Sequence, residues 1–302
     1  MNAPRRGRGR SRKTIELIEA ATRILDEIHP ASVRAVCYRL FTEGLIDSMA
    51  KSNTNKVSRL LTQEREAGNL PWDWIVDETR EAERINTWRD VAEFGNTVKR
   101  AYRRDYWSMQ RSWIEVWSEK GTVRGTLAPI LDKYGVTFRV MHGHGSATAV
   151  HQVAEESSQS TKKLTVLYVG DWDPSGLHMS ELDLPDRLQR YGGNVELVRV
   201  AIARQDTNSK AGVPHFSAHD KERDPRYWWF LNHYGERCHE LDALNPVILR
   251  SRIENEIKMR LDLDAWNHAI QIEAAEIDSM NHLMKHWPGI SGQAKEYPGR
   301  PC

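Results

Sequence analysis

The sequence predicts an α/β protein, α+β overall, in which helical segments precede and follow a parallel sheet. Two observations lead to this prediction. Apolar residues within 15–66 and 246–286 recur at helical spacing, whereas short apolar runs alternate with helical segments from Gln110 onward. Alternating strands and helices are typical of a parallel sheet that is covered by helices.

The composition is that of a soluble globular protein. With 302 residues the chain is long enough for about two domains. Its hydrophobic content of 39% and its charged content of 28% suit a packed core and a solvated surface. No apolar run reaches the roughly 18 residues of a membrane span, and the N-terminus lacks the apolar segment of a secretory signal. The three scattered cysteines argue against a zinc site and a disulfide framework, so we expect a cytoplasmic protein.

Charge is distributed unevenly along the chain. The net charge is only +1, yet residues 1–13 contain basic residues and no acidic one. We expect these residues to form a disordered basic tail that suits a polyanion; the alternative is a solvated tail without a partner.

The N-terminal region predicts three short helices followed by an extended segment. Helical periodicity over 15–28 stops before Pro30, Ser32 is a plausible N-cap of a second helix, and 53–66 predicts a third. An extended piece begins at 71–74. Three helices and a strand in this order predict a winged-helix domain over 14–86, with a plain helical bundle as the alternative.

Two stretches have enough basic residues to bind duplex DNA. The third helix would enter the major groove, with its apolar residues pointing inward and its basic residues pointing outward. The second stretch belongs to a connecting helix over 87–110, where aromatic residues lie between the basic ones. The candidate DNA-binding residues are Lys56, Arg59, Arg65, Lys99, Arg100, Arg103 and Arg104.

The central region predicts a parallel sheet. Four apolar runs bounded by turn residues are the candidate strands, at 112–118, 136–141, 164–170 and 195–202. We place this domain at 111–245 and a helical C-terminal segment at 246–302.

Acidic residues follow two of these strands. Asp171 and Asp173 come directly after the third run, in VLYVGDWDPSG, and Glu119 follows the first. Ligands of parallel sheets bind beyond the carboxyl ends of the strands, and closely spaced carboxylates favour a hard cation such as Mg²⁺. The alternative is an ordinary Asp-rich turn. Glu115 lies mid-strand and is a weaker candidate.

A tyrosine and an arginine share one face of the second helix. Arg34 and Tyr38 are four residues apart. A tyrosine hydroxyl can attack phosphorus, and a nearby cation favours the phenolate and stabilises charge on the phosphate. The alternative is a packed tyrosine beside a surface arginine.

The order of these motifs resembles a known family. A strand ending in Glu119, followed by a strand ending in DxDPxG, resembles the Toprim domain of topoisomerases, primases and some nucleases. Together with the R-x-x-x-Y of the winged helix, residues 15–260 resemble the A subunit of type IIB topoisomerases (topoisomerase VI) and the related meiotic double-strand-break transesterase.

The resemblance implies specific roles. Tyr38 would form a 5′-phosphotyrosyl link, Arg34 would assist at the phosphate, and Glu119, Asp171 and Asp173 would hold Mg²⁺. It also implies a homodimer on double-stranded DNA, in which the tyrosine of one protomer meets the metal of the other. A separate ATPase B subunit would be needed for strand passage, and the protein would be nucleoid-associated.

The sequence also departs from the family. Cys37 precedes Tyr38, where many members have two adjacent tyrosines. The stretch 238–244 resembles the segment that ends the family's domain, so Glu240 and Asp242 are either outer groups of the site or a structural lead-in to a helix. Three functions therefore compete: DNA cleavage and rejoining through Tyr38, a Toprim metal-dependent nuclease in which Tyr38 is structural, and DNA binding without chemistry.

Overall fold

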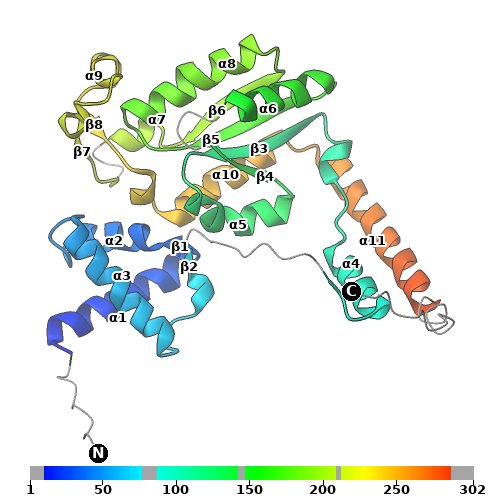
Figure 1. Ribbon diagram of the computed structural model, residues 1–302, viewed down its shortest axis with the longest axis horizontal. Coiled ribbons are helices and arrows are strands. Elements are labelled where there is room, and N and C mark those ends of the chain that lie inside the picture. The colour runs from blue at the N-terminus through cyan, green and yellow to red at the C-terminus, as the bar shows by residue number, and fades with distance from the viewer. Residues whose placement is uncertain (1–9, 77–86, 142–146, 209–211, 287–302) are drawn as a thin grey trace, which may run out of the picture. The chain divides into compact units, whose positions relative to one another are not determined.

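The computed structural model describes residues 10–76, 87–141, 147–208 and 212–286, and the chain divides into two compact units (Figure 1). The first unit is Met1–Glu78 with Ser112–Met259, and the second is Thr79–Arg111 with Arg260–Cys302. A four-stranded parallel sheet lies among helices of the first unit, which confirms the predicted α/β class.

The N-terminal region contains the three predicted helices, α1 (Arg12–Ile28), α2 (Val33–Thr42) and α3 (Lys51–Glu66). Their apolar faces form a common core that includes Ile24, Leu25, Val36 and Leu61. Ser32 is the N-cap of α2, as predicted, because its hydroxyl accepts a hydrogen bond of 3.1 Å from the amide of Ala35.

Two short strands accompany these helices. β1 (Ala31–Ser32) pairs in parallel with β2 (Ile75–Val76). Residues 77–86, where a wing would follow, lie outside the described residues, so the winged-helix assignment stays a prediction.

Residues 10–13, the last part of the predicted disordered tail, are ordered. Helix α1 already begins at Arg12, and the Arg10 guanidinium pairs with Glu64 of α3. Residues 1–9 lie outside the described residues.

All four predicted strands form the sheet, in the order β4–β3–β5–β6 and all parallel. Each strand lies within one residue of its predicted bounds: β3 (Ser112–Ser118), β4 (Thr137–Val140), β5 (Lys163–Val169) and β6 (Val195–Ala201). Side chains of the sheet, including Trp117, Val166 and Tyr168, form a core with α6 (Ala147–Gln159) and α8 (Leu184–Arg190).

Further helices, turns and short strands belong to the first unit. They are α5 (Thr122–Tyr134), α7 (Pro174–His178), a π-helical turn η3 (Met179–Asp183), η4 (Arg204–Thr207), β7 (Phe216–Ser217), η6 (Ala218–Lys221), α9 (Tyr227–Tyr234), β8 (Arg237–Cys238), η7 (Leu241–Ala243) and α10 (Pro246–Arg260).

Close packing joins the N-terminal helices to the sheet region within the first unit. A Cβ atom on Gly125 of α5 would lie 2.3 Å from a methyl carbon of Val76, so only glycine permits this approach. Arg250 of α10 donates hydrogen bonds of 3.0 Å to the carbonyl of Ile28 and 3.2 Å to the carbonyls of Pro30 and Thr126. Helix α2 also packs against η7, whose Leu241 amide binds Asp171 at the carboxyl edge of the sheet.

The second unit pairs two segments that are far apart in sequence. Its helices are α4 (Val91–Ala101) and α11 (Leu263–His286), with η2 (Tyr106–Met109) between α4 and β3. The Tyr102 hydroxyl and the Arg104 guanidinium each donate a 2.5 Å hydrogen bond to Glu276. The connecting helix therefore ends earlier than predicted, because residues after Ala101 pack on α11 instead of continuing the helix.

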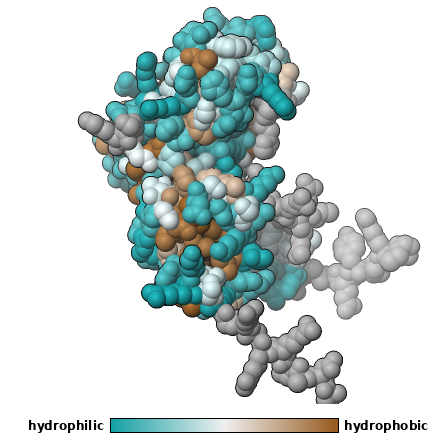
Figure 2. Space-filling model, turned by 90° about the vertical axis from the view of Figure 1, so that its left-hand side faces the viewer, coloured by the Kyte–Doolittle hydropathy of each residue, from teal (hydrophilic) through white to brown (hydrophobic). Residues whose placement is uncertain are grey.

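Most of the face in Figure 2 is hydrophilic, and apolar side chains gather in one area of it. None of the helices in the described residues combines the length and the hydropathy that a membrane span requires.

Candidate functional site

The predicted acidic residues lie at one edge of the sheet. β3 and β5 are neighbours, and Ser118 pairs in register with Val169. Glu119 and Asp171, which follow these two residues, therefore lie at the same edge of the sheet. The expectation that parallel strands bring these carboxylates to a common edge is confirmed.

The turn after β5 is tight. Asp173 is the N-cap of α7, and its Oδ1 accepts a 2.7 Å hydrogen bond from the amide of Gly176. A Cβ atom on Gly176 would lie only 2.5 Å from the carbonyl oxygen of Asp171, which explains the glycine. Lys221 of η6 reaches the other oxygen of Asp173 at 3.3 Å.

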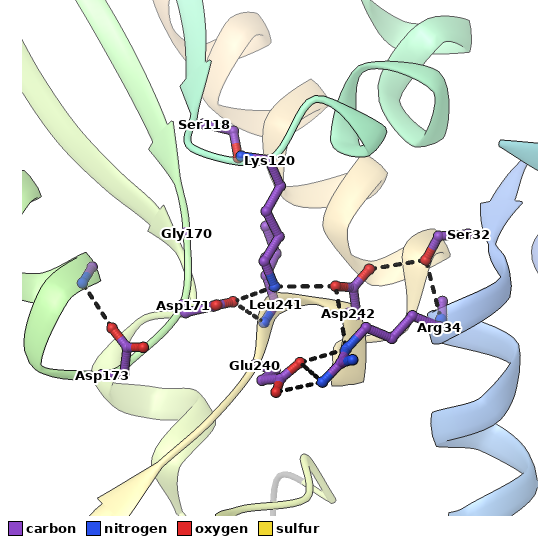
Figure 3. Close-up of polar contacts among 12 residues, drawn as sticks. Ser32, Arg34, Ser118, Lys120, Gly170, Asp171, Asp173, Glu240, Leu241 and Asp242 are labelled. Atoms are coloured by element: carbon purple, nitrogen blue, oxygen red, sulfur yellow. Dashed lines mark hydrogen bonds and ion pairs between the residues drawn. The ribbon is translucent and has the colours of Figure 1, made fainter. Parts of the chain in front are cut away.

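A lysine that sequence analysis missed bridges two acidic residues at this edge. Lys120 Nζ donates hydrogen bonds of 2.8 Å to Asp171 and 3.1 Å to Asp242, and Figure 3 shows it between the two carboxylates. Burial lowers the pKa of Lys120, but Asp171 and Asp242 outweigh burial and the net pKa is raised. Lys120 is therefore a charged counter-ion, and the one signal in the sequence was its position directly after Glu119.

Glu119 faces an environment that favours a cation. Burial, followed by the charges of Asp171 and Asp173, raises the pKa of Glu119 to about 7. The buried hydroxyl of Tyr168 has no hydrogen-bond partner among the described residues, and its pKa is raised by burial and then by Glu119. A divalent cation would relieve this crowding of negative charge.

The residues present fit Mg²⁺ in charge and in donor type, since all three carboxylates are hard oxygen ligands. Within the described part of the chain, however, no three His, Cys, Asp or Glu side chains lie together in a ligating arrangement. Lys120 supplies the positive charge beside Asp171 in this structure.

Arg34 meets the segment after β8. Its guanidinium binds both carboxylate oxygens of Glu240, with Nε and Nη2 each 2.6 Å from an oxygen, and lies 4.0 Å from Asp242. Ser32 donates a 2.9 Å hydrogen bond to Asp242 (Figure 3). The sequence left open what Glu240 and Asp242 do; the structure makes them the partners of Arg34 and Lys120.

Tyr38 is not activated in this structure. Its side chain is 8% exposed, and the Arg34 guanidinium carbon lies 5.7 Å from the centre of its ring. Burial and then the charge of Glu240 raise the pKa of Tyr38 to about 12, although Arg34 opposes both. Arg34 lowers the pKa of Tyr38, as expected, but burial and Glu240 outweigh it, so the net pKa is raised.

Replacing Glu240 by glutamine is expected to lower the pKa of Tyr38 from about 12 toward its ordinary value of about 10. The substitution removes one negative charge while Arg34 stays. The pH dependence of the ring ¹³C shift in tyrosine-labelled protein measures this pKa. As a control, Glu181→Gln removes the carboxylate that raises the pKa of Tyr234 and should leave Tyr38 unchanged. A Tyr38 pKa that stays at about 12 in Glu240→Gln would show that burial alone sets it.

The basic residues of α3 differ in exposure. Lys56 and Arg59 are exposed, as a DNA-contacting surface requires. Arg65 is only 8% exposed, and its guanidinium carbon lies 4.7 Å from the centre of the Trp72 ring. The prediction that Arg65 points outward is wrong, because its side chain packs on Trp72.

The second basic set lies in the other unit. Lys99, Arg100 and Arg103 are exposed, whereas Arg104 is partly buried and pairs with Glu276. The pKa of Arg104 is raised by that carboxylate, which neutralises its charge. Arg104 is therefore a weaker candidate for a phosphate contact than its neighbours.

Glu115 has a structural role. Its buried carboxylate accepts a 2.6 Å hydrogen bond from the Trp117 indole and two of 3.0 Å from Arg139 of β4. These bonds satisfy it within the sheet, in agreement with its being the weaker candidate for the acidic site.

Comparison of the chain with protein-family models, with curated proteins and with solved structures gives no match. The resemblance to type IIB topoisomerases therefore rests on the motifs of the sequence.

Proposed function

We propose that this protein cleaves and rejoins duplex DNA through a covalent link between Tyr38 and a 5′-phosphate, in the manner of a topoisomerase VI A subunit. The observation that carries the proposal is the position of α2. It brings Arg34, one helical turn from Tyr38, to the acidic edge of the sheet in the same unit.

The chain's own residues suggest the course of the reaction. Tyr38 Oη would attack the phosphorus, form the O–P bond and release the 3′-hydroxyl, and the reverse attack would rejoin the strand. Arg34 would exchange Glu240 for a phosphate oxygen, since a guanidinium binds either anion through the same pair of donors. Glu119, Asp171 and Asp173 would hold Mg²⁺, which when bound would stabilise negative charge on the phosphate.

The proposal includes a homodimer, because cutting both strands of a duplex through tyrosine needs two Tyr38 side chains. Strand passage would in addition need a separate ATPase subunit. A nucleoid-associated, cytoplasmic location follows from a chromosomal substrate.

A metal-dependent nuclease is the second candidate, and the environment of Tyr38 favours it. A hydroxyl on a side chain that is 8% exposed, with its pKa raised to about 12, is a poor nucleophile. Water activated at the acidic edge would not need Tyr38.

The test is to incubate the full-length protein with supercoiled plasmid and Mg²⁺, to add denaturant, and to look for DNA that carries covalently bound protein. Adduct supports the proposal. Free nicked or linear DNA without adduct supports the nuclease, and DNA that stays intact while bound contradicts both enzymes.

Arg59→Ala is expected to weaken binding to duplex DNA and to reduce the slope of log K against log salt by about 1, because one phosphate contact is lost. Arg65→Ala is the matched control on the same helix. It should lower the stability of the fold by about 1–3 kcal/mol through lost packing on Trp72, with little change in that slope. Equal changes of slope in the two variants would contradict the assignment of Arg59 to the DNA surface.

A further inference from the structure

Arg199 of β6 binds the backbone of the turn that carries Asp171 and Asp173. Its Nη2 donates to the carbonyl of Gly170 at 3.0 Å and also to the carbonyl of Asp171. Its Nη1 donates to the carbonyl of Gly176 at 3.1 Å. One guanidinium thus ties the start of the turn to the first turn of α7.

The backbone around these carbonyls is closely packed. A Cβ atom on Gly170 would lie 2.7 Å from the Tyr168 ring, and the Arg199 guanidinium carbon lies 5.4 Å from the centre of that ring. Nε of Arg199 donates a further 2.8 Å hydrogen bond to the carbonyl of Ile202. The path of the backbone from Gly170 to Gly176 is therefore set by packing on Tyr168 and by the hydrogen bonds of Arg199.

We propose that Arg199 is a positioning residue that holds the carboxylates of Asp171 and Asp173 in place for a divalent cation. Arg199 reaches the turn through backbone carbonyls and Ser180, so it acts through the shape of the turn. The inference rests on the metal site of the proposed function and adds a residue that no motif of the sequence singled out.

The contacts require arginine rather than another cation. A guanidinium has five donors in a planar fork, which lets one side chain reach Gly170, Asp171 and Gly176 together. Lysine keeps the positive charge but has one nitrogen with three donors, so Arg199→Lys would leave some of these carbonyls without their donor.

The experiment measures Mn²⁺ binding by electron paramagnetic resonance, together with thermal unfolding without metal. Arg199→Lys is expected to weaken Mn²⁺ binding by about tenfold or more, the usual effect of losing a group that orients metal ligands. The matched control is Arg250→Lys, because Arg250 also binds backbone carbonyls in the same unit, those of Ile28, Pro30 and Thr126. It should lower stability without changing Mn²⁺ affinity.

The outcomes distinguish the positioning role of Arg199 from the existence of the metal site. If Arg199→Lys binds Mn²⁺ as tightly as wild type, the positioning role is wrong while the metal site stands. If wild type binds no Mn²⁺, the metal site of the proposed function fails and this inference fails with it. If Arg199→Lys does not fold, Ser180→Ala takes its place, because the Ser180 hydroxyl accepts a 2.5 Å hydrogen bond from Arg199. A smaller loss of Mn²⁺ affinity in that variant supports the role, and an unchanged affinity contradicts it.

Discussion

Replacing Tyr38 by phenylalanine is expected to abolish the covalent DNA adduct and to reduce DNA cleavage by several orders of magnitude. The substitution removes the one atom that a phosphotyrosyl link requires. The ring stays in its buried place beside Arg34, so stability should change by only about 1 kcal/mol. Adduct trapping on supercoiled plasmid with Mg²⁺, alongside thermal unfolding and DNA binding, measures all three effects.

Tyr234→Phe is the matched control for this experiment. Tyr234 has its hydroxyl bound to Glu181, and its pKa is also raised to about 12, by burial and then by that carboxylate. Loss of its hydroxyl should leave cleavage unchanged. Cleavage by Tyr38→Phe at the wild-type rate would remove the tyrosine mechanism and leave the metal-dependent nuclease in its place.

The double substitution Asp171→Asn with Asp173→Asn is expected to abolish stabilisation by Mg²⁺. A ligand that binds only the folded state stabilises it by about 2.7 kcal/mol at a hundred times its dissociation constant. Metal-free stability will also change, because Lys120 loses its bond with the Asp171 carboxylate. The informative quantity is therefore the shift in melting temperature that Mg²⁺ causes in each variant.

Glu115→Gln is the control for the double variant, because Glu115 is a buried carboxylate with a cationic partner, Arg139, in the interior of the sheet. Its melting temperature should fall while its Mg²⁺ shift stays. A Mg²⁺ shift that survives in the double variant would remove the proposed site.

The stabilisation of the folded protein by Mg²⁺ is expected to depend on pH. The folded-state pKa of Glu119 is raised to about 7, so without metal the protonated carboxyl favours the folded state, and this contribution is lost as pH rises through about 7. Mg²⁺ needs the deprotonated form. Its stabilising effect should therefore grow as pH rises through about 7 in wild type.

Local patterns in the sequence were sufficient for most of the secondary structure. The four strands are apolar runs bounded by turn residues, and the Ser32 cap follows from hydroxyl chemistry at a helix start. The meeting of Glu119 with Asp171 also follows, because parallel strands end at one edge. The connecting helix predicted over 87–110 ends early, at Ala101, because Tyr102 binds Glu276, which lies 174 positions away.

The sequence by itself therefore determined the α/β class, the strands, most helices and the acidic edge, all of which depend on neighbours in the chain. Only the tertiary structure decided how the site is arranged. Arg34 is bound by Glu240, 206 positions away, and Lys120 by Asp242, 122 positions away. Such pairs depend on how separate elements pack, and packing is a property of the whole folded unit rather than of any local pattern.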